Sequence, residues 1–209
     1  MDRPDSWLGR DMKHHRLDRV LALDIEMTCW EGEPPAGMSP EPIEIGLVEA
    51  DVETLAVLRE GRYLIRPTRS EVSAFCEGLT GLTAGLLKKE GRRFEEAMRS
   101  IAKEFGVGSK ACVAWGNDWT AIEAECLLRG VANPFPAEHA VNLGGLYTLL
   151  AGGRSRIGQS QAVEGLGLEF EGRPHGAVAD ARAALSVWRE LAGDLRSRLR
   201  DADPTPSPR

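Results

Sequence analysis

The sequence predicts an α/β domain with a mixed five-stranded sheet that is flanked by helices. In the first half of the chain, short runs rich in Val, Leu and Ile follow one another with short links, which is typical of an antiparallel meander. From residue 94 onward, apolar runs alternate with amphipathic segments of helical period. Neither an internal repeat nor a change in composition divides the 209 residues, so we expect one domain.

The expected strands are short and apolar, and the fifth opens a segment that continues as a helix. They comprise residues 20–27, 43–52, 59–67, 111–115 and the beginning of 140–153. The expected helices carry an apolar stripe, and several end at a glycine. They comprise short turns within 69–92, then 94–106, 118–130, the rest of 140–153, 160–168 and 175–199. Around this domain, which we place at 19–199, we expect an irregular arm over 1–18 and a disordered Pro-rich tail over 200–209.

The composition is that of a globular protein, with 42% hydrophobic and 28% charged residues. Since no apolar run approaches the ~20 residues that cross a bilayer and no signal peptide is apparent, we expect no membrane association. The four cysteines are scattered without a CxxC pair, which argues against a zinc knuckle or a disulfide framework and favours a reducing cytoplasm. The net charge of −6 argues against a protein that coats nucleic acid but allows an enzyme that grips a few nucleotides.

Two carboxylates interrupt the first expected strand near its end. Asp24 and Glu26 are two residues apart, so their side chains project from the same face of the strand. Because the strand is apolar on both faces before them, we interpret it as buried. Two neighbouring buried carboxylates repel each other and lose hydration, so they require a cation. The alternative is a partly exposed edge strand that carries both acids in water.

Three further polar residues lie at element boundaries. Asp118 follows a strand at the start of a helix, where ligands bind in open α/β sheets, although a helix N-cap is an equally ordinary role for it. His175 precedes Asp180 by five residues, and Pro174 and Gly176 indicate a break that lets the histidine fold back towards this acid. Taken singly, the histidine is more often a surface residue and Asp180 a solvated helix position.

Together these residues form a constellation suited to two divalent ions. Oxygen ligands favour Mg²⁺ or Mn²⁺ over zinc, and such ions activate water and stabilise a leaving alkoxide during attack on phosphorus. A histidine is then the natural general base.

The order Asp-x-Glu, Asp, His-x4-Asp resembles the DEDDh 3′→5′ exonuclease superfamily, and the segments DIEMTCWEG, LIRPT, VSAFCEGLTGL and GRPHGAVADARAA are similar to its ERI-type RNA exonuclease branch and bacterial relatives. The resemblance implies a ribonuclease H-like fold, two Mg²⁺ or Mn²⁺ ions, and release of 5′-mononucleotides such as AMP from the 3′ end of a nucleic acid. It implies four metal ligands, Asp24, Glu26, Asp118 and Asp180, with His175 as the general base. It also implies a nucleotide site lined by Met27, Thr28, Cys29, Trp30, Leu79, Thr80 and His175.

Trp30 could also stack on a base for physical reasons alone, although an ordinary core tryptophan is the alternative. Three arginines near His175 could hold phosphates or be solvated surface residues: Arg154, Arg156 and Arg173.

The ERI-like motifs favour single-stranded RNA or RNA overhangs as the substrate. A DNA 3′→5′ exonuclease of repair or proofreading type remains open, as does a non-catalytic module that binds nucleotides or RNA ends. The sequence gives no indication of oligomeric state.

Overall fold

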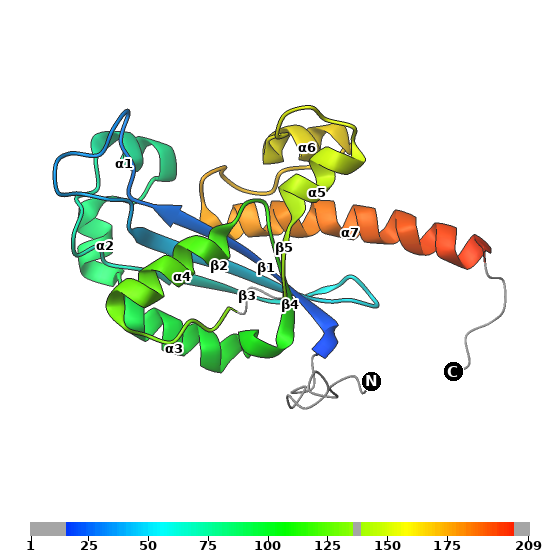
Figure 1. The fold of residues 1–209 in the computed structure, drawn as a ribbon, viewed down its shortest axis with the longest axis horizontal. Coiled ribbons are helices and arrows are strands. Elements are labelled where there is room, and N and C mark those ends of the chain that lie inside the picture. Colours follow the sequence, from blue (N-terminus) through cyan, green and yellow to red (C-terminus); the bar gives the residue numbers. More distant parts are fainter. Residues whose placement is uncertain (1–15, 136–138, 203–209) are drawn as a thin grey trace, which may run out of the picture.

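The computed structural model describes residues 16–135 and 139–202, which fold around one five-stranded sheet in the order β3-β2-β1-β4-β5 (Figure 1). The strands β1, β2 and β3 form an antiparallel meander, and β4 and β5 add in parallel on the other side of β1. The predicted mixed five-stranded sheet is therefore confirmed. The bounds are Arg16–Met27 for β1, Pro42–Asp51 for β2, Val57–Leu64 for β3, Lys110–Ala114 for β4 and Ala140–Asn142 for β5.

The helices lie close to the predicted segments and start and stop at ordinary local signals. Ser73 and Thr83 cap the first two helices by accepting hydrogen bonds from the third backbone N–H that follows each of them. The bounds are Ala74–Thr80 for α1, Ala84–Glu90 for α2, Phe94–Phe105 for α3, Asp118–Arg129 for α4, Leu143–Leu150 for α5, Gln159–Gly165 for α6 and Ala177–Ala202 for α7, with a short 3-10 turn at Val107–Ser109.

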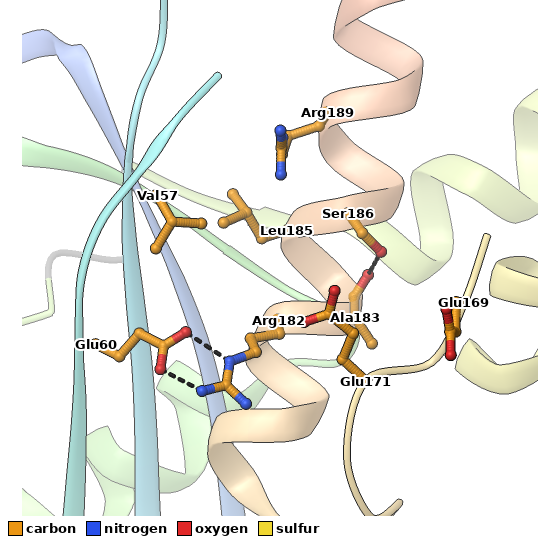
Figure 2. A pocket seen from close by; sticks show the side chains of 9 residues that line it. All are labelled: Val57, Glu60, Glu169, Glu171, Arg182, Ala183, Leu185, Ser186 and Arg189. Carbon is orange, nitrogen blue, oxygen red and sulfur yellow. Dashed lines mark hydrogen bonds and ion pairs between the residues drawn. The ribbon is translucent and has the colours of Figure 1, made fainter. Parts of the chain in front are cut away.

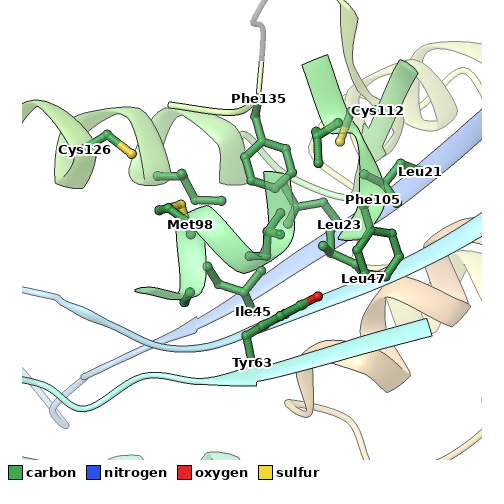
Figure 3. Packing of buried hydrophobic residues seen from close by; sticks show 14 of the residues in the cluster. Leu21, Leu23, Ile45, Leu47, Tyr63, Met98, Phe105, Cys112, Cys126 and Phe135 are labelled. Atoms are coloured by element: carbon green, nitrogen blue, oxygen red, sulfur yellow. The ribbon is translucent and has the colours of Figure 1, made fainter. Parts of the chain in front are cut away.

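The central strand β1 is buried on both faces, as the sequence predicts. Leu21 and Leu23 pack with residues of α3 and α4 in the larger hydrophobic core, which Figure 3 shows. Val20 and Ala22 point to the other face, where they pack against Leu185 of α7. Because both faces of β1 are buried, the polar side chains at its end lie directly beside the hydrophobic core.

Glycine at position 46 lets α7 approach the sheet. A Cβ atom built on Gly46 in β2 would lie 2.1 Å from the carbonyl carbon of Ala177 and 2.4 Å from the nitrogen of Val178. Any side chain there would collide with backbone, so only glycine permits this contact. Gly46 pairs with Asp24 across the β1–β2 ladder, and the first turn of α7 is thereby brought beside the first acid.

The ends of the described chain differ slightly from the expected boundaries. The strand β1 already begins at Arg16, within the expected arm, and α7 continues to Ala202, within the expected tail. The rest of the arm (1–15) and of the tail (203–209) lies outside the described residues. In the described part of the chain, no helix is both long and apolar enough to cross a membrane.

Candidate active site

Four carboxylates and one histidine line a single cavity of about 360 Å³ at the end of β1. Asp24 and Glu26 come from β1, and Asp118 is the first residue of α4. Asp180 lies in the first turn of α7, and His175 lies in the loop before that helix. The structure thus brings together the five residues to which the sequence analysis assigns the chemistry.

Three of these acids are close enough to share one ion. Asp24, Glu26 and Asp180 each offer a carboxylate oxygen, and these oxygens lie within 4.8 Å of one another. Asp118 faces the same cavity, but its Oδ2 accepts a hydrogen bond of 3.3 Å from the backbone N–H of Gly116. The helix N-cap position belongs to Asn117, so the alternative role of Asp118 as a cap is wrong.

Burial and mutual repulsion disfavour the charged forms of these acids. Burial raises the pKa of Glu26 to about 8, and repulsion from Asp180, Glu44 and Asp118 adds to this rise. The pKa of Asp24 is also raised well above its ordinary value, by burial first and then by its carboxylate neighbours. Such a cluster binds either protons or cations. Its donors are carboxylate oxygens, which are the ligands preferred by Mg²⁺ and Mn²⁺, so the residues fit the implied metal.

His175 occupies a backbone conformation that is rare for a residue with a side chain. Its φ angle is +62°, and the helix α7 starts two residues later at Ala177, as the break at Pro174 and Gly176 predicts. The histidine is exposed at the rim of the cavity. A residue other than glycine keeps a left-handed backbone conformation only where neighbouring contacts stabilise it. The position of His175 therefore depends on the contacts made by the residues on either side of it.

Two residues that the sequence analysis does not identify hold this region in place. Glu44 is buried, forms an ion pair with Arg62, and accepts a 3.0 Å hydrogen bond from the backbone N–H of Ala177. The Nε2 of Gln159 donates a 2.7 Å hydrogen bond to the backbone carbonyl of Asp180. The one available signal for Glu44 is its position in β2, directly opposite Glu26 in the ladder.

The two segments expected to contact the nucleotide lie side by side. The Ser73 hydroxyl at the start of α1 donates to the carbonyl of Cys29, and the Cys76 thiol lies 3.6 Å from the carbonyl of Met27. None of the six side chains expected there besides His175 lines the acidic cavity itself. The six are Met27, Thr28, Cys29, Trp30, Leu79 and Thr80.

Two of the six have side chains that serve the protein backbone. Thr28 is fully buried and accepts a hydrogen bond from the N–H of Glu41. Thr80 is buried as well; its hydroxyl donates to the Cys76 carbonyl and accepts from the Leu82 N–H. Both hydroxyl groups therefore already have backbone partners, and contact of these two residues with a nucleotide stays a prediction.

For the other four side chains, contact with a nucleotide also stays a prediction. Met27, Cys29, Trp30 and Leu79 are all half-buried. Trp30 belongs to none of the core clusters among the described residues, unlike an ordinary core tryptophan.

A second pocket, of about 220 Å³, lies between β3 and α7 (Figure 2), and it shares no lining residue with the acidic cavity. Its central charges already pair with each other, because the Arg182 guanidinium donates two hydrogen bonds to the carboxylate of Glu60. We expect the chemistry at the acidic cavity instead, because four carboxylates and His175 line it together.

Comparison with known proteins agrees with this geometry. The RNase_T family model, described as Exonuclease, matches residues 21–188. The mouse 3′-5′ exoribonuclease 1 is 28% identical in an alignment 178 positions long, which covers 79% of this chain and 50% of that protein. The Drosophila melanogaster 3′-5′ exonuclease Snipper is 29% identical in an alignment 209 positions long, which covers 88% of this chain and 74% of that protein.

Solved structures share the fold. The nuclease domain of 3′hExo, a DEDDh family member bound to rAMP, superposes with a TM-score of 0.76 at 24% identity, covering 87% of this chain and 94% of that chain. E. coli Exonuclease I in complex with a dT13 oligonucleotide gives a TM-score of 0.65 at 17% identity, over 88% of this chain and 43% of that chain.

The predicted ribonuclease H-like fold and the resemblance to ERI-type exonucleases are therefore confirmed. The chain spans about half the length of the mouse relative. Because the family model covers most of its residues, the chain belongs to the RNase T family of exonucleases.

Proposed function

We propose that the protein is a metal-dependent 3′→5′ exonuclease that shortens RNA from its 3′ end and releases 5′-mononucleotides. The observation that carries this proposal is the convergence of four carboxylates and His175 on one cavity. It is supported by membership of an exonuclease family and by relatives named as 3′-5′ exoribonucleases. The last nucleotide of the RNA would enter this cavity with its 5′ phosphodiester beside the acids.

The acids would hold two Mg²⁺ or Mn²⁺ ions. Asp24, Glu26 and Asp180 are near enough to share one of them, and Asp118, which lines the same cavity, would complete the set. When bound, such ions lower the pKa of water and neutralise charge on the phosphate and the leaving oxygen.

Residues of the chain itself would transfer the proton and orient the terminal nucleotide. The His175 imidazole would take the proton of the attacking water, because histidine is the side chain that exchanges protons near neutral pH. As the water oxygen bonds to phosphorus, the bond from phosphorus to the 3′ oxygen of the preceding nucleotide breaks. The half-buried surface around Met27, Trp30 and Leu79 would orient the terminal base.

RNA is favoured over DNA as the substrate by the ERI-type relatives. The neighbours in the structure comparison include one bound to rAMP, one described as recognising a histone mRNA stem-loop and one bound to a DNA oligonucleotide. A DNA exonuclease is therefore the second candidate. A non-catalytic binding module is disfavoured because each of the five residues is present and faces the cavity.

A time course on a 3′-tailed RNA and on DNA of the same sequence tests the proposal. With Mg²⁺ or Mn²⁺ we expect the RNA to shorten stepwise with release of 5′-mononucleotides, and EDTA should stop the reaction. The Asp24→Ala variant is the control for contaminating nucleases, since it should lose metal-dependent turnover and keep its fold, as checked by circular dichroism. Equal activity in this variant would refute the proposal, and shortening of DNA alone would favour the second candidate.

A cytoplasmic location is also proposed. The four cysteines are free in the structure, in agreement with a reducing compartment.

A further inference from the structure

The structure distinguishes three arginines that the sequence alone treats alike. Arg173 donates hydrogen bonds of 2.7 and 3.3 Å to the carbonyls of Gly78 and Leu79, so it ties the loop of His175 to the end of α1. Arg154 and Arg156 are both exposed, but Arg154 does not line the acidic cavity. Arg156, two residues further along, lines this cavity together with the acids.

Local geometry holds the Arg156 guanidinium beside the third acid. Its Nη2 donates a 3.2 Å hydrogen bond to the carbonyl of Trp115 at the end of β4. A Cβ atom built on Gly116 would lie 3.2 Å from the same Nη2 and 3.3 Å from Oδ2 of Asp118. The glycine is therefore the spacer that lets the guanidinium and the carboxylate approach the strand end from two sides. Attraction to Arg156 also opposes the rise that burial causes in the pKa of Asp118.

The charge around the cavity makes this arginine unusual. Apart from His175, Arg156 is the one basic side chain among the residues that line it, against four carboxylates. A guanidinium has five N–H donors in a planar fork that matches the oxygens of a phosphate. In the described part of the chain, the hydrogen bond to the Trp115 carbonyl is the one that Arg156 makes, so donors remain for a ligand.

We propose that Arg156 is a catalytic residue that binds the 5′ phosphate of the 3′-terminal nucleotide through its free guanidinium N–H groups. This inference rests on the proposed function and adds a phosphate contact that comes from the chain itself. The phosphodiester carries one negative charge before cleavage, and the phosphate of the released mononucleotide carries up to two. A fixed cation at this position therefore binds the product phosphate and the transition state more tightly than the substrate.

The competing interpretation is structural: Arg156 holds the Trp115 carbonyl and balances Asp118 without touching a ligand. The two interpretations differ in what the arginine discriminates. A phosphate-binding residue distinguishes 5′-AMP from adenosine, whereas a structural residue affects both alike.

The test compares Arg156→Gln and Arg156→Lys with the matched control Arg154→Gln, which removes the same charge two residues away. Binding of 5′-AMP and of adenosine is measured by calorimetry, with and without Mg²⁺, and thermal unfolding confirms that each variant is folded. Arg156→Gln should weaken 5′-AMP binding by about 10- to 100-fold, as expected for loss of a hydrogen bond to a charged group. Its affinity for adenosine should not change, and Arg154→Gln should match the wild type in both.

The kinetic result should follow the same pattern. On RNA, Arg156→Gln should lower kcat by about 10²-fold, as for loss of one preorganised donor, with a smaller effect on KM. Arg156→Lys should be intermediate, since it keeps the charge without the fork.

The inference is overturned if Arg156→Gln binds 5′-AMP like the wild type, loses 5′-AMP and adenosine equally, or behaves like Arg154→Gln. It is overturned as well if the wild type binds no 5′-AMP. Failure of the proposed function looks different: the wild type would degrade no nucleic acid, while selective loss of 5′-AMP binding in Arg156→Gln could still be observed.

Discussion

The residues of the acidic cavity affect the stability of the fold mainly through their charge and less through packing. Asp24 and Glu26 are held away from water by a strand whose residues 20–23 belong to the core. Burial and mutual repulsion therefore raise the pKa of both groups, and the cluster destabilises the folded chain whenever it carries neither protons nor cations.

The raised pKa of Glu26 predicts how this destabilisation of the folded chain depends on pH. In the metal-free folded chain its pKa is raised to about 8, so between its ordinary value of 4.5 and 8 the folded state holds a proton that the unfolded state has released. The free energy of unfolding should therefore fall as the pH rises through this interval, by at most about 1.4 kcal/mol per pH unit for one such group.

Denaturant unfolding in EDTA at several pH values measures this slope, and Glu26→Gln is the comparison. The variant should lose less stability than the wild type as the pH rises, and adding Mg²⁺ should restore the wild type most strongly at the higher pH. Parallel pH profiles for the two proteins would contradict the assignment.

At the scale of elements, the site depends on how closely the start of α7 lies on the sheet. Gly46 permits this contact and Glu44 accepts the hydrogen bond of the first backbone N–H of the helix. The helix in turn carries Asp180 and places His175 in its left-handed conformation. A change in β2 can therefore act on residues more than a hundred positions away.

Gly46→Ala should push the start of α7 away from β2. We expect a loss of about 1–3 kcal/mol in the free energy of unfolding, typical of overpacking, and a larger proportional loss of nuclease activity. The matched control is Gly193→Ala in α7, where an added Cβ would meet nothing within 4 Å. This control should gain about 0.5–1 kcal/mol and keep its activity. Unchanged activity in Gly46→Ala would show that the position of the helix is not critical.

At the scale of the whole molecule, the net charge of −6 limits how nucleic acid is held. A protein that tracks a single strand with many Lys and Arg residues loses affinity steeply in salt, with a slope of about 0.7 per neutralised phosphate. Here Arg156 is the one arginine or lysine among the residues that line the cavity, against four carboxylates.

The salt dependence of kcat/KM on single-stranded RNA should therefore be shallow. Between about 50 and 200 mM KCl at fixed Mg²⁺ we expect a loss below about tenfold, which corresponds to one or two phosphate contacts. A loss of about 10³-fold would reveal a basic surface outside the cavity that contributes strongly.

The sequence predicts most of this architecture because the relevant signals are local. The two-residue spacing of Asp24 and Glu26, and the break at Pro174 and Gly176, follow from neighbouring residues alone. The roles of Glu44 and Arg156 do not, because each depends on a partner that only the folded chain provides. Arg154 and Arg156 have the same local chemistry, so their different surroundings could not be read from the sequence.

The same reasoning applies to Thr28 and Thr80. Both lie in motifs that resemble nucleotide-contacting segments, yet their hydroxyl groups form hydrogen bonds with backbone groups of α1 and of the neighbouring loops. A short polar side chain near a ligand site satisfies the backbone as readily as the ligand, and only the burial of the two residues separates these roles.

The acidic cavity draws its first acid from β1 and its last from α7, the final element of the described chain. During synthesis on the ribosome, a growing polypeptide in which α7 is still inside the exit tunnel lacks both His175 and Asp180 at the sheet. Under the proposed function, such a chain should gain exonuclease activity only after α7 has docked on the sheet and brought His175 and Asp180 to the other acids.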